Sequence, residues 1–432
     1  MPRRLPFLFL NVAHFATHYF LAIFPTAVLA IHRDWGAPYG ETLSLGTVAF
    51  VALALGTLPA GWLGDRWRRS HLIVICFLGL GSASILAGLA VGPLSLIISL
   101  SLVGLFAAIY HPVAVAAVVQ LAEGSGRAIA VNGVWGNMGY AGAAVLTGVL
   151  TEAFGWRMAF IAPGAVAVAL GIAAALLMGR SVDVRRGVKT PPTGTPVEYR
   201  SAQLRVFVFV GVSAIFGGLI SNGLTVTMPK LFEEQLGSWS GGIAHIGLLV
   251  SVAFAVAAFA QLPVGALLDR YGARPVALAT LALQVPLLVL IGQVSGPALL
   301  PFVIVTLLLE FGGFPITDWL VGQYVAGQWQ SRVYAVSYLG ALGVAGITIP
   351  AIAFLHEFTG SFALVFVLLG AAATVVCAAA LLLPAGRGPA MKRTRKVAAD
   401  IMTSGQVRPL GSRLATLAMA AAKSRSSSKL VP

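Results

Sequence analysis

Apolar runs of roughly 20 residues recur along this chain from its first residues almost to residue 384, and no other feature constrains its fold as strongly. A helix of that length crosses the ~30 Å hydrocarbon core of a bilayer, because an α-helix rises about 1.5 Å per residue. Only 10% of the residues are charged and 58% are hydrophobic, whereas a soluble chain carries about 25% charged residues. The sequence therefore predicts an all-α polytopic membrane protein.

The spacing of the apolar runs predicts about twelve transmembrane helices, at roughly 30 residues for each helix with its loop. The expected helix cores are 7–31, 42–63, 72–91, 95–119, 129–151, 157–178, 206–228, 244–267, 275–293, 298–324, 333–355 and 362–383. A polar stretch and a basic tail lie outside these cores. The expected organisation is a six-helix bundle at 1–179, a cytoplasmic linker at 180–203, a second six-helix bundle at 204–384 and a tail at 385–432.

Lysines and arginines are distributed unevenly about these helices. Of the 28 basic residues, only Arg33, Arg157 and Lys230 fall on one side of the membrane, and the others fall on the opposite side or in the tail. Cytoplasmic loops carry an excess of Lys and Arg, so we expect both termini in the cytoplasm of a bacterial inner membrane. The net charge of +14 then favours contact of the loops and tail with anionic lipids rather than with nucleic acid.

An internal repeat is the clearest motif. Residues 58–66 read LPAGWLGDR and residues 262–270 read LPVGALLDR, with six of nine positions identical at one constant offset. A weaker echo, at an offset one residue longer, pairs Glu152 with Glu357 and Gly155 with Gly360. The repeat predicts a duplicated six-helix unit joined by a flexible linker.

At these residues the chain resembles the major facilitator superfamily, over roughly residues 5–384. The family's loop motif, Gly-x-Leu-x-Asp-Arg-x-Gly followed by basic residues, is similar to both copies, although Arg68 replaces the later glycine of the first copy. The resemblance implies two parallel repeats that rock around a site near the midplane. It also implies that the gating loops contain Gly61, Asp65, Arg66, Arg69, Gly265, Asp269 and Arg270.

A narrower set of residues is similar to the fosmidomycin-resistance branch of that superfamily, and that branch resembles transporter-like proteins of magnetosome membranes assigned to iron uptake. The residues are Tyr110-His111-Pro112, Ala13-His14 and Phe24-Pro25. The chain departs from the branch at His18 and Val113, where the pattern has acids. The arginine and the Gly-Pro pair typical of drug/proton antiporters are also missing. The resemblance implies efflux of a small compound or uptake of iron, the latter in an invaginated, magnetosome-type membrane.

Ionisable side chains at membrane depth are costly and mark candidate functional sites. Asn11, His14 and His18 share one helical face by their spacing, and Pro112 is expected to kink the helix beside His111. We expect a substrate or ion cavity lined by Asn11, His14, His18, His111, Asn132, Asn137, Asn222, Glu310 and Asp318. The alternative is that these groups are hydrogen-bond partners between helices.

Imidazole titrates near physiological pH, so these histidines and a desolvated carboxylate could carry a coupling proton. His14 and His18, one turn apart, could also bind a divalent metal. The sequence has no phosphate-binding loop, Gly-x-Ser-x-Gly or His-Glu-x-x-His motif, which argues against an enzyme, and no cofactor is expected. The hypothesis is a secondary transporter for a small molecule or metal ion; the alternative is a transport-inactive scaffold or receptor.

Overall fold

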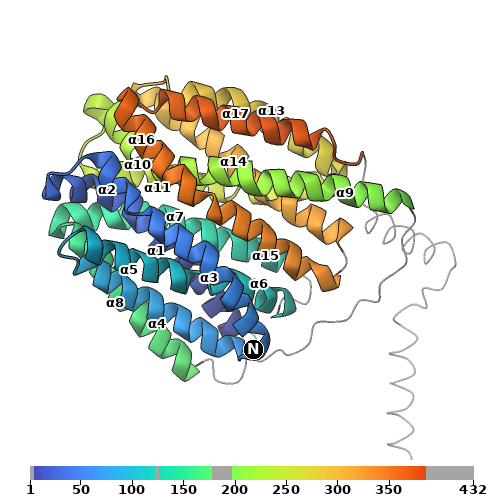
Figure 1. The fold of residues 1–432 in the computed structure, drawn as a ribbon, viewed down its shortest axis with the longest axis horizontal. Coiled ribbons are helices and arrows are strands. Elements are labelled where there is room, and N and C mark those ends of the chain that lie inside the picture. Colours follow the sequence, from blue (N-terminus) through green and yellow to red (C-terminus); the bar gives the residue numbers. More distant parts are fainter. Residues whose placement is uncertain (1–3, 122–125, 178–196, 326, 386–432) are drawn as a thin grey trace, which may run out of the picture. The chain divides into compact units, whose positions relative to one another are not determined.

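The structure is a computed structural model, and it describes residues 4–121, 126–177, 197–325 and 327–385. The described residues are almost entirely helical, as the apolar runs predict (Figure 1). Helices are the expected elements inside a bilayer, because an α-helix satisfies its own backbone hydrogen bonds where no water is available. The all-α architecture is confirmed.

The described part of the first half contains eight helices, and two pairs of consecutive helices each form one broken span. They are α1 (Arg4–Trp35), α2 (Tyr39–Ser44), α3 (Thr47–Arg66), α4 (Arg69–Gly88), α5 (Pro93–Ala107), α6 (Tyr110–Leu121), α7 (Gly126–Phe154) and α8 (Trp156–Leu177). The second half repeats the pattern, with a π-helical turn at Ser213–Gly217 inside its first span. Its helices are α9 (Val197–Val212), α10 (Gly218–Gln235), α11 (Ile243–Ala258), α12 (Gln261–Tyr271), α13 (Ala273–Ile291), α14 (Leu299–Tyr324), α15 (Gly327–Gly343), α16 (Ala345–Thr359) and α17 (Ala363–Ala380).

Each expected span coincides with a helix or a broken helix. Among the described residues, 11 helices are long and apolar enough to cross a membrane. The remaining expected span, 129–151, lies within α7, which is 29 residues long. Helix α9 already begins at Val197, so the end of the expected linker is helical. The rest of that linker, 180–196, and the tail after 385 lie outside the described residues.

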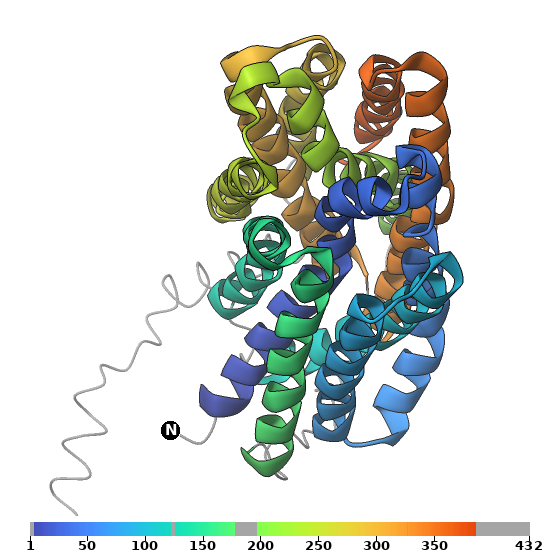
Figure 2. The same cartoon turned by 90° about the vertical axis from the view of Figure 1, so that its left-hand side faces the viewer.

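The two halves, α1–α8 and α9–α17, meet along several helix pairs. Helix α7 packs on α1 within its own half and on α11 of the other half, while α3 contacts α15 and α2 contacts α16. Figure 2 shows α7, in green-teal, between the dark blue α1 and the yellow-green α11. Residues up to Gly386 form one compact unit, and the division into two six-helix bundles stays a prediction.

Chain direction places the two loop motifs on one face of the bundle. The end of α3, with Arg66, and the end of α12, with Arg270, follow spans that run in the same direction. We call this the loop-motif face. The ends of α1, α7, α10 and α16 and the starts of α2 and α11 lie at the opposite face.

Candidate transport site

Asn132, on α7, joins three helices by hydrogen bonds of its side chain and backbone. Its Nδ2 donates to Asn11 Oδ1 at 2.8 Å, and its Oδ1 accepts from the Tyr110 hydroxyl at 3.1 Å. Its backbone oxygen lies 2.8 Å from Nδ1 of His14. Because Asn11, Asn132 and His14 are all buried, these bonds fix the contact of α1, α6 and α7 in an environment where an unpaired polar group is costly.

Three histidines lie together beside this network. The ring centroids of His14 and His18 are 4.8 Å apart, those of His14 and His111 are 5.5 Å apart, and those of His18 and His111 are 5.6 Å apart. His14 and His18 come from one face of α1, as their spacing predicts, whereas His111 comes from α6. The structure thus brings the three predicted histidines into one cluster.

A glycine face of α7 makes this close approach possible. A Cβ atom added to Gly136 would lie 2.5 Å from the ring of His14, and one added to Gly142 would lie 2.7 Å from the ring of Phe15. Small residues let helix backbones approach closely in membranes. The glycines of α7 therefore determine how near α1 and its histidines can lie.

Tyrosines enclose the histidine cluster, and the sequence did not single out two of the three. Tyr110 stacks on His14 with centroids 4.5 Å apart, and Tyr140 lies 4.7 Å from His18. Tyr338, from α15 of the second half, stacks on His111 at 4.9 Å. Both halves of the chain therefore contribute rings to one site. Only Tyr110 had a sequence signal, its position beside His111.

Two histidine nitrogens in this cluster have no hydrogen-bond partner among the described residues. They are Nδ1 of His18 and Nδ1 of His111, and both atoms are buried. Buried polar atoms are nearly always hydrogen-bonded, so an unpartnered one calls for an explanation such as a ligand, an ion or water. The cluster has the chemistry to accept a hydrogen bond, hold a proton or coordinate a cation.

The same cluster also satisfies one requirement of a metal site. One ligand nitrogen from each of His14, His18 and His111 can be chosen so that all three lie within 4.8 Å of one another. Imidazole is a common ligand for zinc, copper, iron and nickel. The carbonyl of Asn132 at Nδ1 of His14 leaves Nε2 of that ring as the ligand atom, an arrangement that metal-binding histidines commonly show.

The other predicted cavity residues lie on α7, α10 and α14. Glu310, on α14, is buried and accepts a 2.7 Å hydrogen bond from Nε2 of Gln284, a partner that the sequence did not indicate. Asn222 donates to the carbonyl oxygens of Gly218 and Ala341, which ties α10 to α15. Asp318 is exposed, two turns beyond Glu310. Asn137 is buried, and its Nδ2 has no partner among the described residues.

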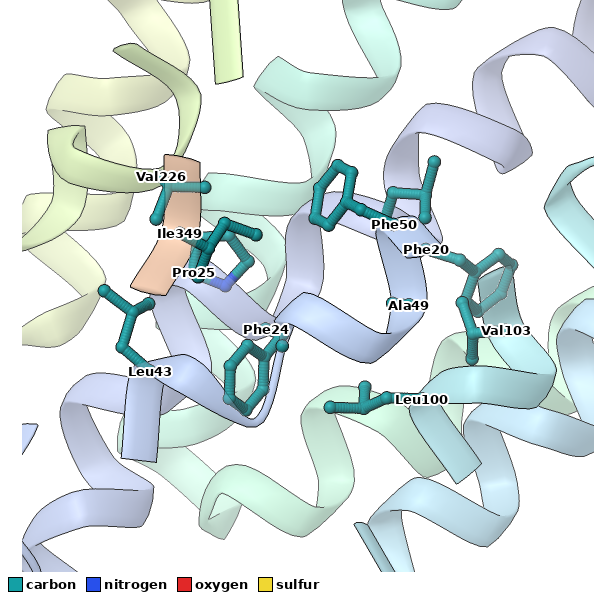
Figure 3. A pocket seen from close by; sticks show the side chains of 12 residues that line it. Phe20, Phe24, Pro25, Leu43, Ala49, Phe50, Leu100, Val103, Val226 and Ile349 are labelled. Carbon is teal, nitrogen blue, oxygen red and sulfur yellow. The ribbon is translucent and has the colours of Figure 1, made fainter. Parts of the chain in front are cut away.

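An apolar pocket continues the histidine-bearing face of α1. Leu21 and Pro25 lie three and seven residues beyond His18, on the same helical face, and both line the pocket. Figure 3 shows Phe20, Phe24 and Phe50 around it, with Val226 and Ile349 from the second half. None of the predicted polar cavity residues lines this pocket. The polar histidine cluster and the apolar pocket are therefore separate parts of the surface along α1.

The loop-motif residues lie in the second halves of α3 and α12, apart from Arg69, which begins α4, and Gly265, near the middle of α12. The guanidinium of Arg66 lies 4.0 Å from the ring centroid of Trp62, and that of Arg270 lies 5.1 Å from the ring centroid of Tyr271. Asp269 accepts a 3.3 Å hydrogen bond from Nε1 of Trp319 on α14. The side chain of Asp65 lies outside the described residues. Gly61, Arg69 and Gly265 are half-buried, and the gating role of all seven stays a prediction.

The model of the Major Facilitator Superfamily matches residues 10–242 and again residues 210–424. The two matches overlap at residues 210–242 and together span residues 10–424.

Two curated relatives are transport or resistance proteins. The chain is 31% identical over 239 residues to the puromycin resistance protein pur8 of Streptomyces alboniger, covering 53% of this chain and 42% of that protein. It is 30% identical over 146 residues to a probable 4-methylmuconolactone transporter of Cupriavidus pinatubonensis, covering 32% of this chain and 34% of that protein. The matches thus span less than half the length of each relative.

A solved structure shares the fold. It is the inward-facing, unoccupied crystal structure of a bacterial homologue of the human lysosomal transporter Spinster, with a TM-score of 0.66 and 15% sequence identity. The match covers 88% of this chain and 95% of that one. At this identity the likeness shows the architecture alone.

Proposed function

The chain belongs to the major facilitator superfamily, and from this premise we propose that it moves a small organic solute by alternating access around the histidine cluster, coupled to a proton gradient. Membership makes it a multi-pass secondary transporter and not an enzyme. The observation that carries the finer proposal is the meeting of His14, His18 and His111 with Tyr338 of the second half. Alternating access requires a site that contacts both halves.

An organic solute fits the chemistry along α1. The histidines and tyrosines supply hydrogen-bonding and ring-stacking groups, and the pocket around Phe20, Phe24 and Phe50 supplies apolar surface next to them. Ligand sites commonly combine an apolar wall with a few polar groups that set orientation. The drug and lactone named for the two relatives are organic molecules of this kind.

Proton coupling is supported by the chemistry of the same histidines. Their ring nitrogens can each gain or lose one proton, and the unpartnered Nδ1 atoms of His18 and His111 lie in the interior of the bundle. A proton bound there would add positive charge at the place where both halves meet. Glu310 with Gln284 is a second buried group able to hold a proton, on the side of the second half.

A metal ion is the second candidate substrate, because three histidine nitrogens lie close enough together to share one ion. A divalent ion at this site would be held by neutral imidazole ligands, because the group of three histidines contains no carboxylate among the described residues. Iron uptake and a magnetosome-type membrane belong to this candidate. The two curated relatives carry the names of an organic drug and a lactone, so the organic solute is the first candidate.

The test is uptake into proteoliposomes with an imposed pH gradient, offering labelled puromycin, a muconolactone, iron and zinc in separate assays. We expect gradient-driven movement of an organic compound and a loss of about tenfold or more in His18→Ala, which corresponds to about 1.4 kcal/mol. His245→Ala is the matched control, because this exposed histidine lies at the start of α11 outside the cluster.

Movement of metal but of no organic compound would replace the first candidate by the second. Unchanged transport in a chain with His18→Ala, Glu310→Gln and Asp318→Asn together would contradict the cavity proposed here. Movement of none of the four probes, in a folded protein, would favour a scaffold or receptor. The proposed location, a bacterial inner membrane with both termini in the cytoplasm, is tested separately below.

A further inference from the structure

Two glutamates form hydrogen bonds between the two halves at the face opposite the loop motifs. Glu152, near the end of α7, accepts a hydrogen bond from the backbone N–H of Ala244, at the start of α11, with a distance of 2.9 Å. Glu357, near the end of α16, accepts one from the backbone N–H of Gly40, at the start of α2, with a distance of 2.8 Å. The first half supplies the acceptor in one bond and the donor in the other.

These two contacts are related by the internal repeat. Gly40 and Ala244 are separated by the same offset as Asp65 and Asp269, and Glu152 and Glu357 by an offset one residue longer. The relation therefore covers both donors and both acceptors. Duplication of a unit reproduces contacts within each half automatically, but a reciprocal pair between halves also requires the halves to be arranged about a twofold pseudo-axis.

The local geometry that presents each glutamate is duplicated as well. Gly155 and Gly360, three residues after the glutamates, have φ angles of 84° and 68°. Such positive values favour glycine, because it lacks a Cβ. Each glycine N–H bonds back to a carbonyl four residues earlier, Gly155 to Thr151 at 3.0 Å and Gly360 to His356 at 2.8 Å. Both helices thus end two residues beyond their glutamate, which leaves the carboxylate at the end of the helix.

The surroundings show close packing on both sides. A Cβ added to Gly40 would lie 2.6 Å from Cδ of Glu357, and Gly242, next to the α11 contact, is similarly covered by the carboxylate of Glu152. A salt bridge from Arg33 to Glu233 joins α1 to α10 at the same face. Glu233 also forms a salt bridge with Lys230, at 2.6 Å. The two halves are therefore held together here by several polar contacts.

We propose that Glu152 and Glu357 form a paired latch, in which each half binds a backbone N–H of the other and holds this face of the transporter closed. Opening this face breaks both bonds together, because a rocking motion about the central site separates both helix pairs. Both carboxylates are exposed, so water can replace the lost bonds at modest cost. A latch of this kind favours the closed state without preventing the transition.

The latch goes beyond the proposed substrate and coupling, and it can be tested without either. The protein is reconstituted in lipid nanodiscs with nitroxide labels at Val91→Cys and Gln293→Cys, exposed positions of the two halves at this face, after replacement of Cys76 and Cys377. Double electron–electron resonance then gives the populations of short and long distances. The variants are Glu152→Gln, Glu357→Gln and the pair, with Glu41→Gln as control, because that exposed carboxylate adjoins Gly40.

We expect each single variant to raise the long-distance population about two- to five-fold, because that is the effect of one carboxylate at the start of a helix. The double variant should raise it by the product of the two effects, about four- to twenty-five-fold. Glu41→Gln should leave the distribution unchanged. Ala244→Pro removes the donor from the other side of one bond, at a first-turn position where proline is tolerated. It should give at least the shift of Glu152→Gln, because the glutamine oxygen can still accept a hydrogen bond. The two together should shift no further than Ala244→Pro alone.

A double variant with the wild-type distribution, in protein that retains its helix content and thermal midpoint, would overturn the latch. So would an effect of Glu41→Gln equal to that of Glu152→Gln, because general charge removal would then explain both. Additive shifts from Ala244→Pro and Glu152→Gln would also overturn it, by showing that the two residues do not share one bond. Failure of every solute assay would leave these distance results intact.

Discussion

At the scale of single residues, the site depends on Asn132 more than on any one histidine. Asn132→Ala would leave Asn11 and Tyr110 without their buried partners, which costs about 1–3 kcal/mol for each such group. We expect a lower thermal midpoint in detergent and loss of transport. Asn137→Ala is the control, because this buried asparagine lies on the same helix and its Nδ2 has no partner among the described residues. Equal destabilisation by the two variants would contradict the joining role of Asn132.

Residue by residue, the sequence predicted the ionisable members of the site better than their surroundings. His14 and His18 were placed on one face by helical spacing, and His111 was found because an imidazole at membrane depth is unusual. Tyr140 and Tyr338 were not predicted, because a tyrosine in a transmembrane helix is common and only the packing of α15 on the first half, where it contacts α3, brings Tyr338 to His111. Asn222 and Glu310 bond within the second half, which no sequence spacing indicates.

At the scale of elements, the contact of α7 with α1 determines the geometry of the histidine cluster. Gly136→Ala would place a Cβ 2.5 Å from the His14 ring, which is held by Asn132 and stacked on Tyr110, so α1 or the ring must move. We expect a lower thermal midpoint and reduced transport. Gly211→Ala is the matched control, because no heavy atom lies within 4 Å of its added Cβ. It should be neutral or stabilising by up to about 1 kcal/mol, as alanine favours helix.

The positions of most helices could be predicted, because an apolar run of sufficient length allows little besides a spanning helix. The breaks within spans could not. The gap between α2 and α3 and the π-helical turn at Ser213–Gly217 depend on packing and not on an apolar pattern. Helix α7 was expected from its length, although its many glycines and asparagines make it the least apolar of the first-half spans. Those residues serve its contacts with α1 and α11.

At the scale of the whole molecule, the repeat and the uneven charge make one joint prediction about orientation. Trp67 and Tyr271 occupy repeat-related, exposed positions at the loop-motif face, whereas Val91 and Gln293 lie at the opposite face. In intact cells, a membrane-impermeant maleimide should label cysteines placed at Val91 and Gln293 and should label those at Trp67 and Tyr271 only after permeabilisation. The excess of Lys and Arg near Trp67 and Tyr271 is the physical reason.

The four positions also test the parallel arrangement of the halves. The second half begins at the same face as the first only if the first half contains an even number of spans. Trp67 must then behave as Tyr271 does, and Val91 as Gln293. Labelling from outside at Trp67 and Tyr271 together would invert the molecule while keeping its repeat. Labelling at only one of them would contradict the parallel repeat itself, and with it the twofold relation that places Glu152 and Glu357 at one common face.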